Sequence, residues 1–334
     1  MDRTTTFGDI QPRNAAHAAK RMLKTARFFN VTARYSEVDP LPRNAGDTLK
    51  FRRYNDLPIP DAPLSEVINP EASIPTFEDV EVTVEEYGQI VRLTQKIKDM
   101  HEDPVFQEMF DKAGKAMGEC SQLVDFNSLK AGTNAYYSGG TTRATVNASI
   151  TNNLCKKVIR QLSNDGGSPI TRRIKAGVKI ATEPVPEAYI GIVHTDLRAD
   201  LENLDGWQPV AFYSDSDKAD PGEIGQCEGI RFIVHRKAPK WLAAGVSGST
   251  YLTNGASGTG ECDVYPLIVV SEDSYSRVPL SGKEAVKPMV VNPGKPSPGD
   301  PTGRFGSIAW VAYFACVITN QAWVARVEVG ATAL

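Results

Sequence analysis

The chain has 334 residues, of which 41% are apolar and 23% are charged, and its formal net charge is -3. This length allows two or three compact units with a buried core, and the composition is that of an ordinary soluble globular protein. The net charge argues against binding of nucleic acid through the overall charge. No secretory apolar region follows Met1 and no apolar run is long enough to span a membrane, so we expect no membrane partner.

The first 45 residues are predicted to form an N-terminal arm, because a short helical pattern from Asn14 to Phe29 is too small to be a domain. The segment from Met1 to Asp56 holds eleven Lys or Arg residues against six Asp or Glu residues. Such a basic segment can contact phosphates without reading base sequence, or it can lie on a neighbouring subunit or in solvent. These interpretations stay open here. The candidate contact residues in the arm are Arg13, Lys20, Arg21 and Arg27.

Residues 46–97 are predicted to form a long two-stranded excursion. Its first extended run contains Arg52, Arg53 and Tyr54, and five prolines follow at a density that excludes a helix or a central strand. A second run, residues 78–97, alternates valines with acids and is predicted to pair back on the first. An isolated hairpin is not stable in water, so we expect this excursion to lie on another surface.

The segment 103–131 predicts the longest helix of the chain. Asp103 is a good N-cap, Pro104 suits the first helical position, and Gly132 follows the last turn. The length predicts a spine rather than a packed core helix. Its apolar stripe consists of Phe106, Met109, Phe110, Ala113, Met117, Cys120 and Val124. The residues expected off this stripe are Lys112, Lys115, Glu119 and Gln122.

Beyond this helix the pattern changes from helical to β-rich. Residues 148–167 predict a second helix, with Leu154, Val158 and Leu162 facing inward. From residue 170 onward strands dominate, and Pro266 predicts that the strand in 262–270 lies at an edge or contains a bulge. Residues 292–306 are predicted to be a Pro/Gly linker, and two strands joined at 319–321 complete the chain.

The stretch "DSDKADPGEIGQCEGIRFIVHR", residues 215–236, holds the clearest candidates for chemistry. Its acids could bind a metal, but their spacing fails the calcium-loop template, so a solvated acidic loop is expected. The glycines do not match a phosphate-binding loop and lead into a strand instead of a helix. The acids are Asp215, Asp217, Asp220 and Glu223, and the glycines are Gly222, Gly225 and Gly229.

Other catalytic or metal-binding patterns are absent from the sequence. His194 and His235 each end an apolar run, without the spacing of a metal pair, and are predicted to be ordinary strand-end histidines. The five cysteines show no CxxC spacing and are predicted to be reduced, mostly buried thiols in a cytosolic protein. No nucleophile motif is present. We therefore expect a protein that is not an enzyme and that has no cofactor or metal.

The order of these parts resembles the major capsid proteins of tailed bacteriophages with the HK97-type fold, and within them the family of the N4-like phages. The pair "PGEIG" and "GIRF" is the most specific part of the match. The matching segments are "GDTLKFRRYNDL" (46–57), "YGQIVRLTQKI" (87–97), "DP" (103–104), "VHTDLRADL" (193–201), "PGEIGQCEGIRFIV" (221–234) and "GSIAWVAYFACVI" (306–318).

The resemblance implies an α+β protein with an N-terminal arm, an extended β-hairpin loop, a peripheral domain built on a spine helix, and an axial domain. The implied parts are the arm 1–45, the extended loop 46–97, the peripheral domain 98–179 with the spine helix 103–131, the axial domain 180–290, and the linker with the final peripheral strands 291–334.

The resemblance also implies a structural protein of the virion, which assembles in the host cytoplasm. Its copies would form pentamers and hexamers that close into an icosahedral shell around double-stranded DNA, contacted non-specifically. The implied partners are a portal, a decoration protein and a scaffolding protein, which we expect to be separate because no room for a scaffolding segment precedes the arm. The candidate assembly residues beyond the arm are Arg52, Arg53, Tyr54, Tyr87, Glu223 and Arg231.

Two alternatives stay open. The first is the shell protein of an encapsulin-like bacterial compartment, which would have the same fold and enclose an enzyme instead of DNA. The second is a β-rich hydrolase that uses Asp215, Asp217 or Glu223.

Overall fold

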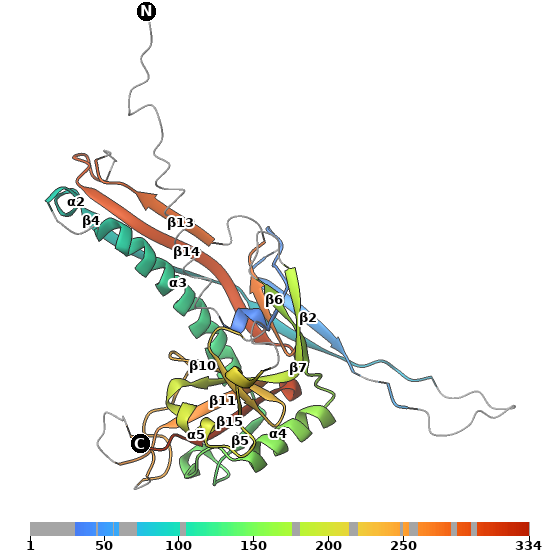
Figure 1. Cartoon of the computed structure of the whole chain (residues 1–334). Coiled ribbons are helices and arrows are strands. Elements are labelled where there is room, and N and C mark those ends of the chain that lie inside the picture. The colour runs from blue at the N-terminus through green and yellow to red at the C-terminus, as the bar shows by residue number, and fades with distance from the viewer. Residues whose placement is uncertain are drawn as a thin grey trace, which may run out of the picture.

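The computed structural model describes residues 31–44, 46–55, 57–59, 72–100, 105–175, 181–213, 220–247, 250–253, 260–281, 286–294 and 299–333. The molecule is elongated: a body built on one sheet carries a long extension made of a second sheet and a helix, and a separate hairpin projects from it (Figure 1). No described helix has both the length and the apolar character needed to cross a membrane.

The body contains an eight-stranded sheet with mixed strand directions. β10 pairs in parallel with β7, and β5 with β15, whereas the remaining pairs are antiparallel. The strands in spatial order are β5 (Ala135–Tyr137), β15 (Val324–Gly330), β11 (Val264–Val270), β7 (Ala181–His194), β10 (Ile230–His235), β9 (Glu223–Cys227) and β8 (Gln208–Pro209), and β6 (Ile170–Lys175) also pairs with β7.

Helices cover one face of this sheet. α4 (Asn152–Asn164) begins after Thr151, whose side chain accepts a hydrogen bond from the Leu154 amide and so caps the helix. Its buried residues Val158 and Leu162 belong to one core cluster with side chains of β7, β10, β11 and β15. The burial of Val158 and Leu162 confirms the predicted inward face of the second helix, α4. The same cluster includes Leu201 of the short helix α5 (Arg198–Glu202).

The long extension consists of a five-stranded sheet covered on one face by α3 (Val105–Lys130) (Figure 1). The central strand β14 alternates buried and half-buried residues, and its buried residues pack against Phe110, Ala113 and Met117 of α3. α2 (Gln95–Met100) lies at the far end. The strands are β1 (Glu37–Val38), β12 (Tyr275–Pro279), β14 (Phe305–Ile318) and β13 (Val286–Val291), with β4 (Glu85–Thr94) on the other edge of β14.

α3 differs from the predicted spine in its C-terminal half. Phe126 and Leu129 are fully buried and pack in a second core cluster against the face of the eight-stranded sheet opposite α4. Gln122, expected off the apolar stripe, is also fully buried. The sequence predicts a spine rather than a packed core helix, but the helix passes from the long extension onto the body, so its buried side changes along its length. The predicted cap residues Asp103 and Pro104 lie outside the described residues.

The predicted pairing of residues 78–97 with the first strand is right only for its first half. β2 (Thr48–Tyr54) pairs with β3 (Phe77–Thr83), whereas β4 pairs with β14 over ten residues. The alternating pattern runs on through Val84 without a break, so the sequence gives no sign that the strand changes its partner. The hairpin itself therefore ends at Thr83.

Of two further predictions about the C-terminal strands, one needs correction. β11 is an interior strand without a bulge, although β7 pairs with it only over Ile268–Val270, so Pro266 has a single strand neighbour, β15. The two strands predicted to join at 319–321 are confirmed as β14 and β15, which follow each other through a short 3-10 turn (Gln321–Trp323) and lie in different sheets. The segment 292–306 joins β13 to its antiparallel partner β14, and residues 295–298 of it are not described.

Sheet membership crosses the predicted domain boundaries at 180 and 290. β5 and β6 precede residue 180 but lie in the eight-stranded sheet, as does β15. β12 precedes residue 290 but lies in the five-stranded sheet. The chain therefore passes between the two sheets several times instead of completing one unit before the next.

The burial of the C-terminal half of α3 generates a stability prediction. Replacing Leu129 by Ala should lower the free energy of unfolding by about 2–5 kcal/mol, because it opens a cavity in the core. The matched control is Leu123→Ala in the same helix, where the side chain is half exposed and the expected loss is below about 0.5 kcal/mol. Urea unfolding followed by tryptophan fluorescence measures both. Equal losses would show that this half of α3 is not a core element.

A buried charge cluster and candidate assembly surfaces

The stretch 220–235 forms a hairpin of β9 and β10 on the body. Glu228 and Gly229 make its two-residue turn, both with positive φ (52° and 79°), between the paired residues Cys227 and Ile230. Two central residues of positive φ are what the twist of a tight hairpin requires. Gly225 has another reason to be glycine: a Cβ there would lie 2.5 Å from the Trp207 ring. This stretch is therefore a structural corner.

The expectation of a solvated acidic loop is wrong for Glu223. Its side chain is 1% exposed and forms an ion pair with Arg231, which is 3% exposed. The Arg231 Nε donates to Oε1 at 2.7 Å and Nη2 to Oε2 at 2.5 Å. The Tyr213 hydroxyl donates to Oε1 and the Asp220 amide to Oε2, both at 2.9 Å. Four donors thus satisfy this buried carboxylate, as burial of a charge requires.

Asp220 extends this cluster to the N-terminal part of the described chain. Its buried carboxylate accepts a hydrogen bond from the Tyr35 hydroxyl and lies 3.7 Å from Nη1 of Arg34. Burial, together with the Asp220 carboxylate, raises the pKa of Tyr35 well above its usual value, so the phenol stays protonated as the donor. The cluster therefore holds a segment almost 200 residues away in sequence.

A second buried polar group holds the same segment from α3. Thr32 donates to Oδ2 of Asp125 at 2.5 Å, and the Val31 amide donates to Oε1 of Gln122 at 2.7 Å. Burial raises the pKa of Asp125, and the Arg277 guanidinium, 3.5 Å away, opposes this shift. The 3-10 turn Thr32–Arg34 is thus fixed on both sides.

We call residues 31–41 the anchor segment. After the two polar groups, β1 pairs in parallel with β12, and Leu41 forms a bridge with Leu280. The hairpin strand β2 begins at Thr48, soon after this bridge. The anchor segment therefore fixes the root of the β2–β3 hairpin through polar contacts with Asp220 and α3 and through pairing with the five-stranded sheet.

The hairpin carries a ladder of ion pairs across its two strands. Lys50 pairs with Glu81 at 2.5 Å, Arg53 with Glu78 at 2.7 Å, and Arg52 binds Asp79 with two hydrogen bonds of 2.8 and 3.0 Å. These contacts match the cross-strand register. The cations of β2, predicted as assembly contacts, are therefore neutralised within their own chain.

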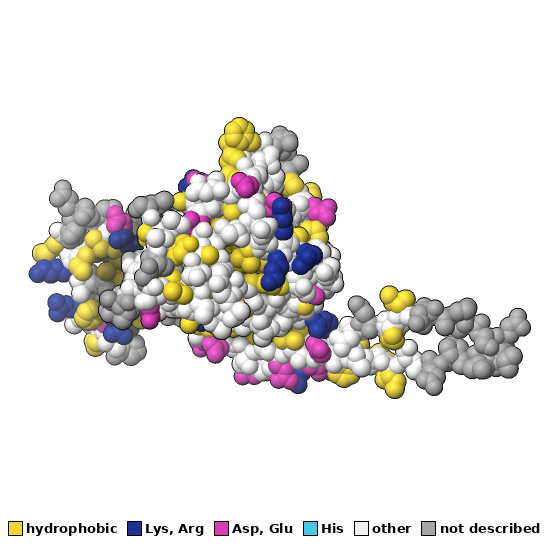
Figure 2. Space-filling view, turned by 90° about the horizontal axis from the view of Figure 1, so that it is seen from below, with side chains coloured by type: hydrophobic (Ala, Val, Ile, Leu, Met, Phe, Trp, Pro, Cys, Tyr) yellow, Lys and Arg dark blue, Asp and Glu magenta, His cyan; other side chains and the backbone are white. Residues whose placement is uncertain are grey.

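Apolar side chains remain open along the hairpin. Leu49 and Phe51 lie opposite Val82 and Val80 on one face and are only partly buried. Further out the exposure rises, and Figure 2 shows hydrophobic side chains along this projection. The exposed large apolar residues of this projection are Tyr54, Leu57, Ile59, Ile74 and Phe77, with Ile59 at 90% and Ile74 at 84%. A ribbon of this kind needs a second surface to cover it.

The long extension has a second open surface. The face of β4, β14 and β13 that points away from α3 carries small or half-exposed residues on β14. Ile90 and Met289 lie in register on either side of Ala309, and both are exposed. Val291 and Phe305 add exposed apolar area to the same region.

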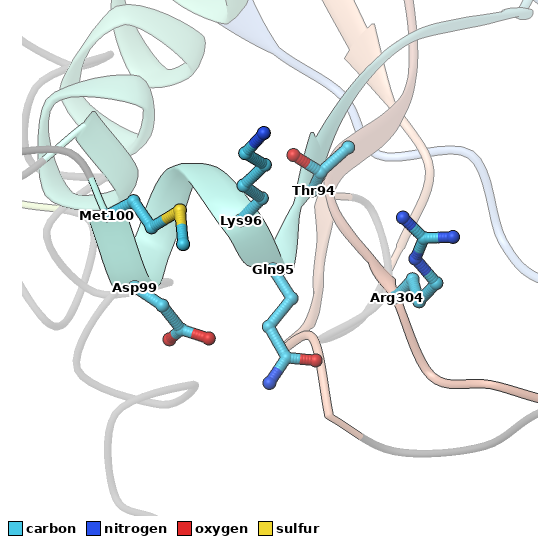
Figure 3. A pocket seen from close by; sticks show the side chains of 6 residues that line it. All are labelled: Thr94, Gln95, Lys96, Asp99, Met100 and Arg304. Atoms are coloured by element: carbon cyan, nitrogen blue, oxygen red, sulfur yellow. The ribbon is translucent and has the colours of Figure 1, made fainter.

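A shallow hollow of about 250 Å³ lies at the tip of the long extension (Figure 3). The Gln95 amide donates to the Arg304 carbonyl at 2.7 Å, which joins the end of β4 to the start of β14 there. The six described lining residues are mostly exposed, and none of them is a buried nucleophile or base. The hollow has the character of a contact surface. Its lining residues are Thr94, Gln95, Lys96, Asp99, Met100 and Arg304.

Only some of the predicted assembly residues can be placed. Four of them lie outside the described residues: Arg13, Lys20, Arg21 and Arg27. The hydrolase candidates Asp215 and Asp217 also lie outside them. Among those described, Tyr54 is exposed at the hairpin. Tyr87 stacks on Phe314 at 4.8 Å, and burial together with a hydrogen bond to Glu85 raises its pKa to about 12.

Glu223 and Arg231 form a buried ion pair within their own chain, which is the intrasubunit alternative for Arg231. A role of either residue in assembly stays a prediction. Sequence reasoning missed Tyr35, which belongs to this cluster, and Gln122 and Asp125, which belong to the second buried polar group. A buried glutamine or aspartate has no signature in sequence, because its partners come from distant segments.

The remaining candidates are structural. His194 and His235 lie opposite each other at the ends of the parallel strands β7 and β10, and each Nδ1 accepts a backbone amide two residues later. Among the described residues, no group of three or more His, Cys, Asp or Glu side chains could hold a metal ion. All five cysteines are free, and four of them are buried, which agrees with the prediction.

The fold is that of known phage capsid chains. No protein-family model matches the sequence, and no curated protein matches it. The capsid of Ralstonia phage GP4 matches with a TM-score of 0.65 at 11% identity, covering 89% of this chain and 87% of that one. The Cyanophage Pam1 capsid asymmetric unit gives 0.61 at 13%, covering 100% of both chains. The head structure of the Helicobacter pylori bacteriophage KHP40 gives 0.59 at 13%, covering 90% and 88%.

The buried cluster generates a prediction with an internal control. Arg231→Met should lower the free energy of unfolding by about 3–5 kcal/mol, because it leaves the Glu223 charge buried without its cation. Arg52→Met removes a pair of the same two-bond geometry in the exposed hairpin, where water screens the charges, and should leave the free energy of unfolding almost unchanged. Urea unfolding measures both variants. A similar small cost for the two would contradict the proposed weight of the cluster.

The tyrosines predict a loss of stability at alkaline pH. Burial raises the pKa of Tyr35, Tyr213, Tyr265 and Tyr275 above the usual value, and that of Tyr87 to about 12. Because the folded pKa exceeds the unfolded value of about 10, their contribution is complete below that pH and is lost as pH rises through the folded values. Near-ultraviolet absorbance should show a late ionisation step that coincides with unfolding. A single early step in a folded chain would refute this.

Proposed function

We propose that this chain is the major capsid protein of a tailed bacteriophage. The observation that carries the proposal is the structural match to phage capsid chains, which covers about nine tenths of this chain and of each of those chains. The open apolar surfaces of the hairpin and of the long extension support it, because a chain that acted alone would leave them in water.

The finer proposal is an HK97-type coat protein of the N4-like phages. Its copies assemble in the host cytoplasm as pentamers and hexamers, which close into the icosahedral shell of the virion around double-stranded DNA. The partners proposed with it are a scaffolding protein, a portal and a decoration protein. Three segments that carry the resemblance in sequence contain strands of the structure. These are β2 of the hairpin in 46–57, β9 and most of β10 in 221–234, and most of β14 in 306–318.

The geometry supports a specific mechanism of assembly. The anchor segment fixes the root of the hairpin, and the ion-pair ladder keeps its two strands in register. The hairpin then lays Tyr54, Phe77 and their neighbours on an adjacent copy. Shell closure rests on many such modest contacts, each repeated once per subunit, instead of on one strong site.

The proposed protein is not an enzyme. The hydrolase alternative needs a carboxylate that can accept a proton or attack a substrate, but Glu223 is buried and receives four hydrogen bonds. Alanine replacement of Asp215 and Asp217 tests the rest of that alternative, since shells should still form. The compartment alternative has the same fold, and the content of purified particles separates the two, because only a phage coat encloses kilobases of DNA.

Removal of the hairpin tip should abolish assembly without unfolding the chain. Tyr54 and Phe77 are paired across the hairpin, so an Asn-Gly turn can join them directly in place of residues 55–76. We expect this variant to unfold in urea like the unmodified chain but to give no closed shells in negative-stain electron micrographs, whereas the unmodified chain forms them. A deletion of residues 1–27 should behave in the same way.

The matched control keeps the hairpin intact. Exchanging the charges of one cross-strand pair, Lys50→Glu with Glu81→Lys, preserves the ladder and should preserve the shells. Normal particles from the shortened hairpin would overturn the proposed mechanism. An unmodified chain that stays monomeric under all assembly conditions would overturn the proposed function itself.

A further inference from the structure

A long segment of the chain contains no acidic residue. Asp and Glu make up 40 of the 334 residues, so a segment of this length would hold about five of them, yet none occurs between Asp125 and Asp165. The same segment contains five cations and many Asn, Thr and Ser residues. The cations are Lys130, Arg143, Lys156, Lys157 and Arg160.

The fold brings three of these cations together on the outward face of α4. Cys155, Val158 and Leu162 face the core, which turns the other side of the helix to solvent. Figure 2 shows a group of Lys and Arg side chains on the body, seen from the side that carries α4 in Figure 1. The exposed residues of α4 are Asn153, Lys156, Lys157, Arg160, Gln161, Ser163 and Asn164.

The contacts of these side chains leave the face cationic. Lys156 lies 3.4 Å from Glu228, but its side chain is 59% exposed. The Lys157 Nζ lies 5.5 Å from the centre of the Tyr136 ring, which is not an acid. Asp165, which follows the last residue of the helix, accepts two hydrogen bonds from the side chain of Gln161. Arg143 belongs elsewhere, because the buried Glu328 holds it with two hydrogen bonds.

We propose that the outward face of α4 binds the phosphate backbone of double-stranded DNA without reading its sequence. Lysine, arginine, asparagine, glutamine and serine are the side chains that commonly contact phosphates. The face from Asn153 to Asn164 spans about 16 Å, a length over which a duplex presents about ten negative charges. Three cations against that many phosphates give weak binding per copy, which suits a surface repeated many times. This inference rests on the proposed function, which places DNA next to the shell.

The test compares two triple variants of the full chain. The first replaces Lys156, Lys157 and Arg160 by Gln, which removes three charges from α4 and keeps good helix formers. The control replaces Lys112, Arg198 and Lys237 by Gln, three exposed cations on other elements, of which Arg198 is in a surface ion pair as Lys156 is. The probe is a fluorescent 30-base-pair duplex of arbitrary sequence, and binding is measured by anisotropy at several salt concentrations.

We expect the α4 variant to bind more weakly and its salt dependence, the slope of log K against log salt, to become shallower by up to about 2.7, or 0.9 for each lost phosphate contact. The control should keep the slope of the unmodified chain. Equal changes in both variants would overturn the proposal, since overall charge would then explain the binding. A chain that does not bind the duplex would overturn it too.

Electron microscopy of the same α4 variant separates the two proposals. Closed shells together with an unchanged salt slope would refute DNA binding by α4 and leave the proposed function standing. If the unmodified chain forms no shells, the proposed function fails whatever the duplex measurement shows. A heparin-binding loss equal to the duplex-binding loss agrees with the phosphate contact, because both polymers are polyanions, whereas a loss for heparin alone would contradict it.

Discussion

The buried ion pair of Glu223 and Arg231 is the contact on which the arrangement of the chain depends. A guanidinium on the inner face of a sheet must find a carboxylate, and that carboxylate must find donors for its remaining lone pairs. The donors come from Tyr213 and from the Asp220 amide, which fixes Asp220 beside the pair. Asp220 then accepts the Tyr35 hydroxyl. One buried charge thus determines where the anchor segment lies.

The molecule has two kinds of contact surface, buried polar contacts at the anchor segment and open apolar surfaces elsewhere. The contacts that hold the anchor segment are polar, buried and directional, so they define one position for the root of the hairpin. The surfaces left open for partners are apolar, on the hairpin and on the outer face of β4, β14 and β13. A directional root with an apolar, less directional tip suits the proposed role, in which each copy would make the same contact in slightly different geometries around a closed shell.

The elements that the sequence predicts well are those whose signals are local. The helix α4 follows from its cap Thr151 and from Val158 and Leu162, and β14 from the alternation of Ile308, Trp310 and Ala312. The second helix and the strand-end histidines were confirmed for the same reason. The resemblance predicted a phage-capsid fold, which agrees with the likeness to solved phage capsid chains. The HK97-type domain plan stays a prediction. The site residues were predicted less well, because the solvent exposure of a side chain and the identity of its ion-pair or hydrogen-bond partner depend on distant parts of the chain.

The sequence by itself determined the two longer helices and most of the longer strands. It also determined that the chain has no recognisable catalytic or phosphate-binding motif, and that cations outnumber acids in its first part and in 126–164. Only the tertiary structure decided that β4 leaves β3 to pair with β14, that Leu129 lies in a core, and that Glu223 is buried while Lys156 is exposed. The physical reason is the same in each case. Periodicity and capping act within a few residues, whereas the choice of strand partner and the burial of a charge depend on surfaces that meet only when distant parts of the chain fold together.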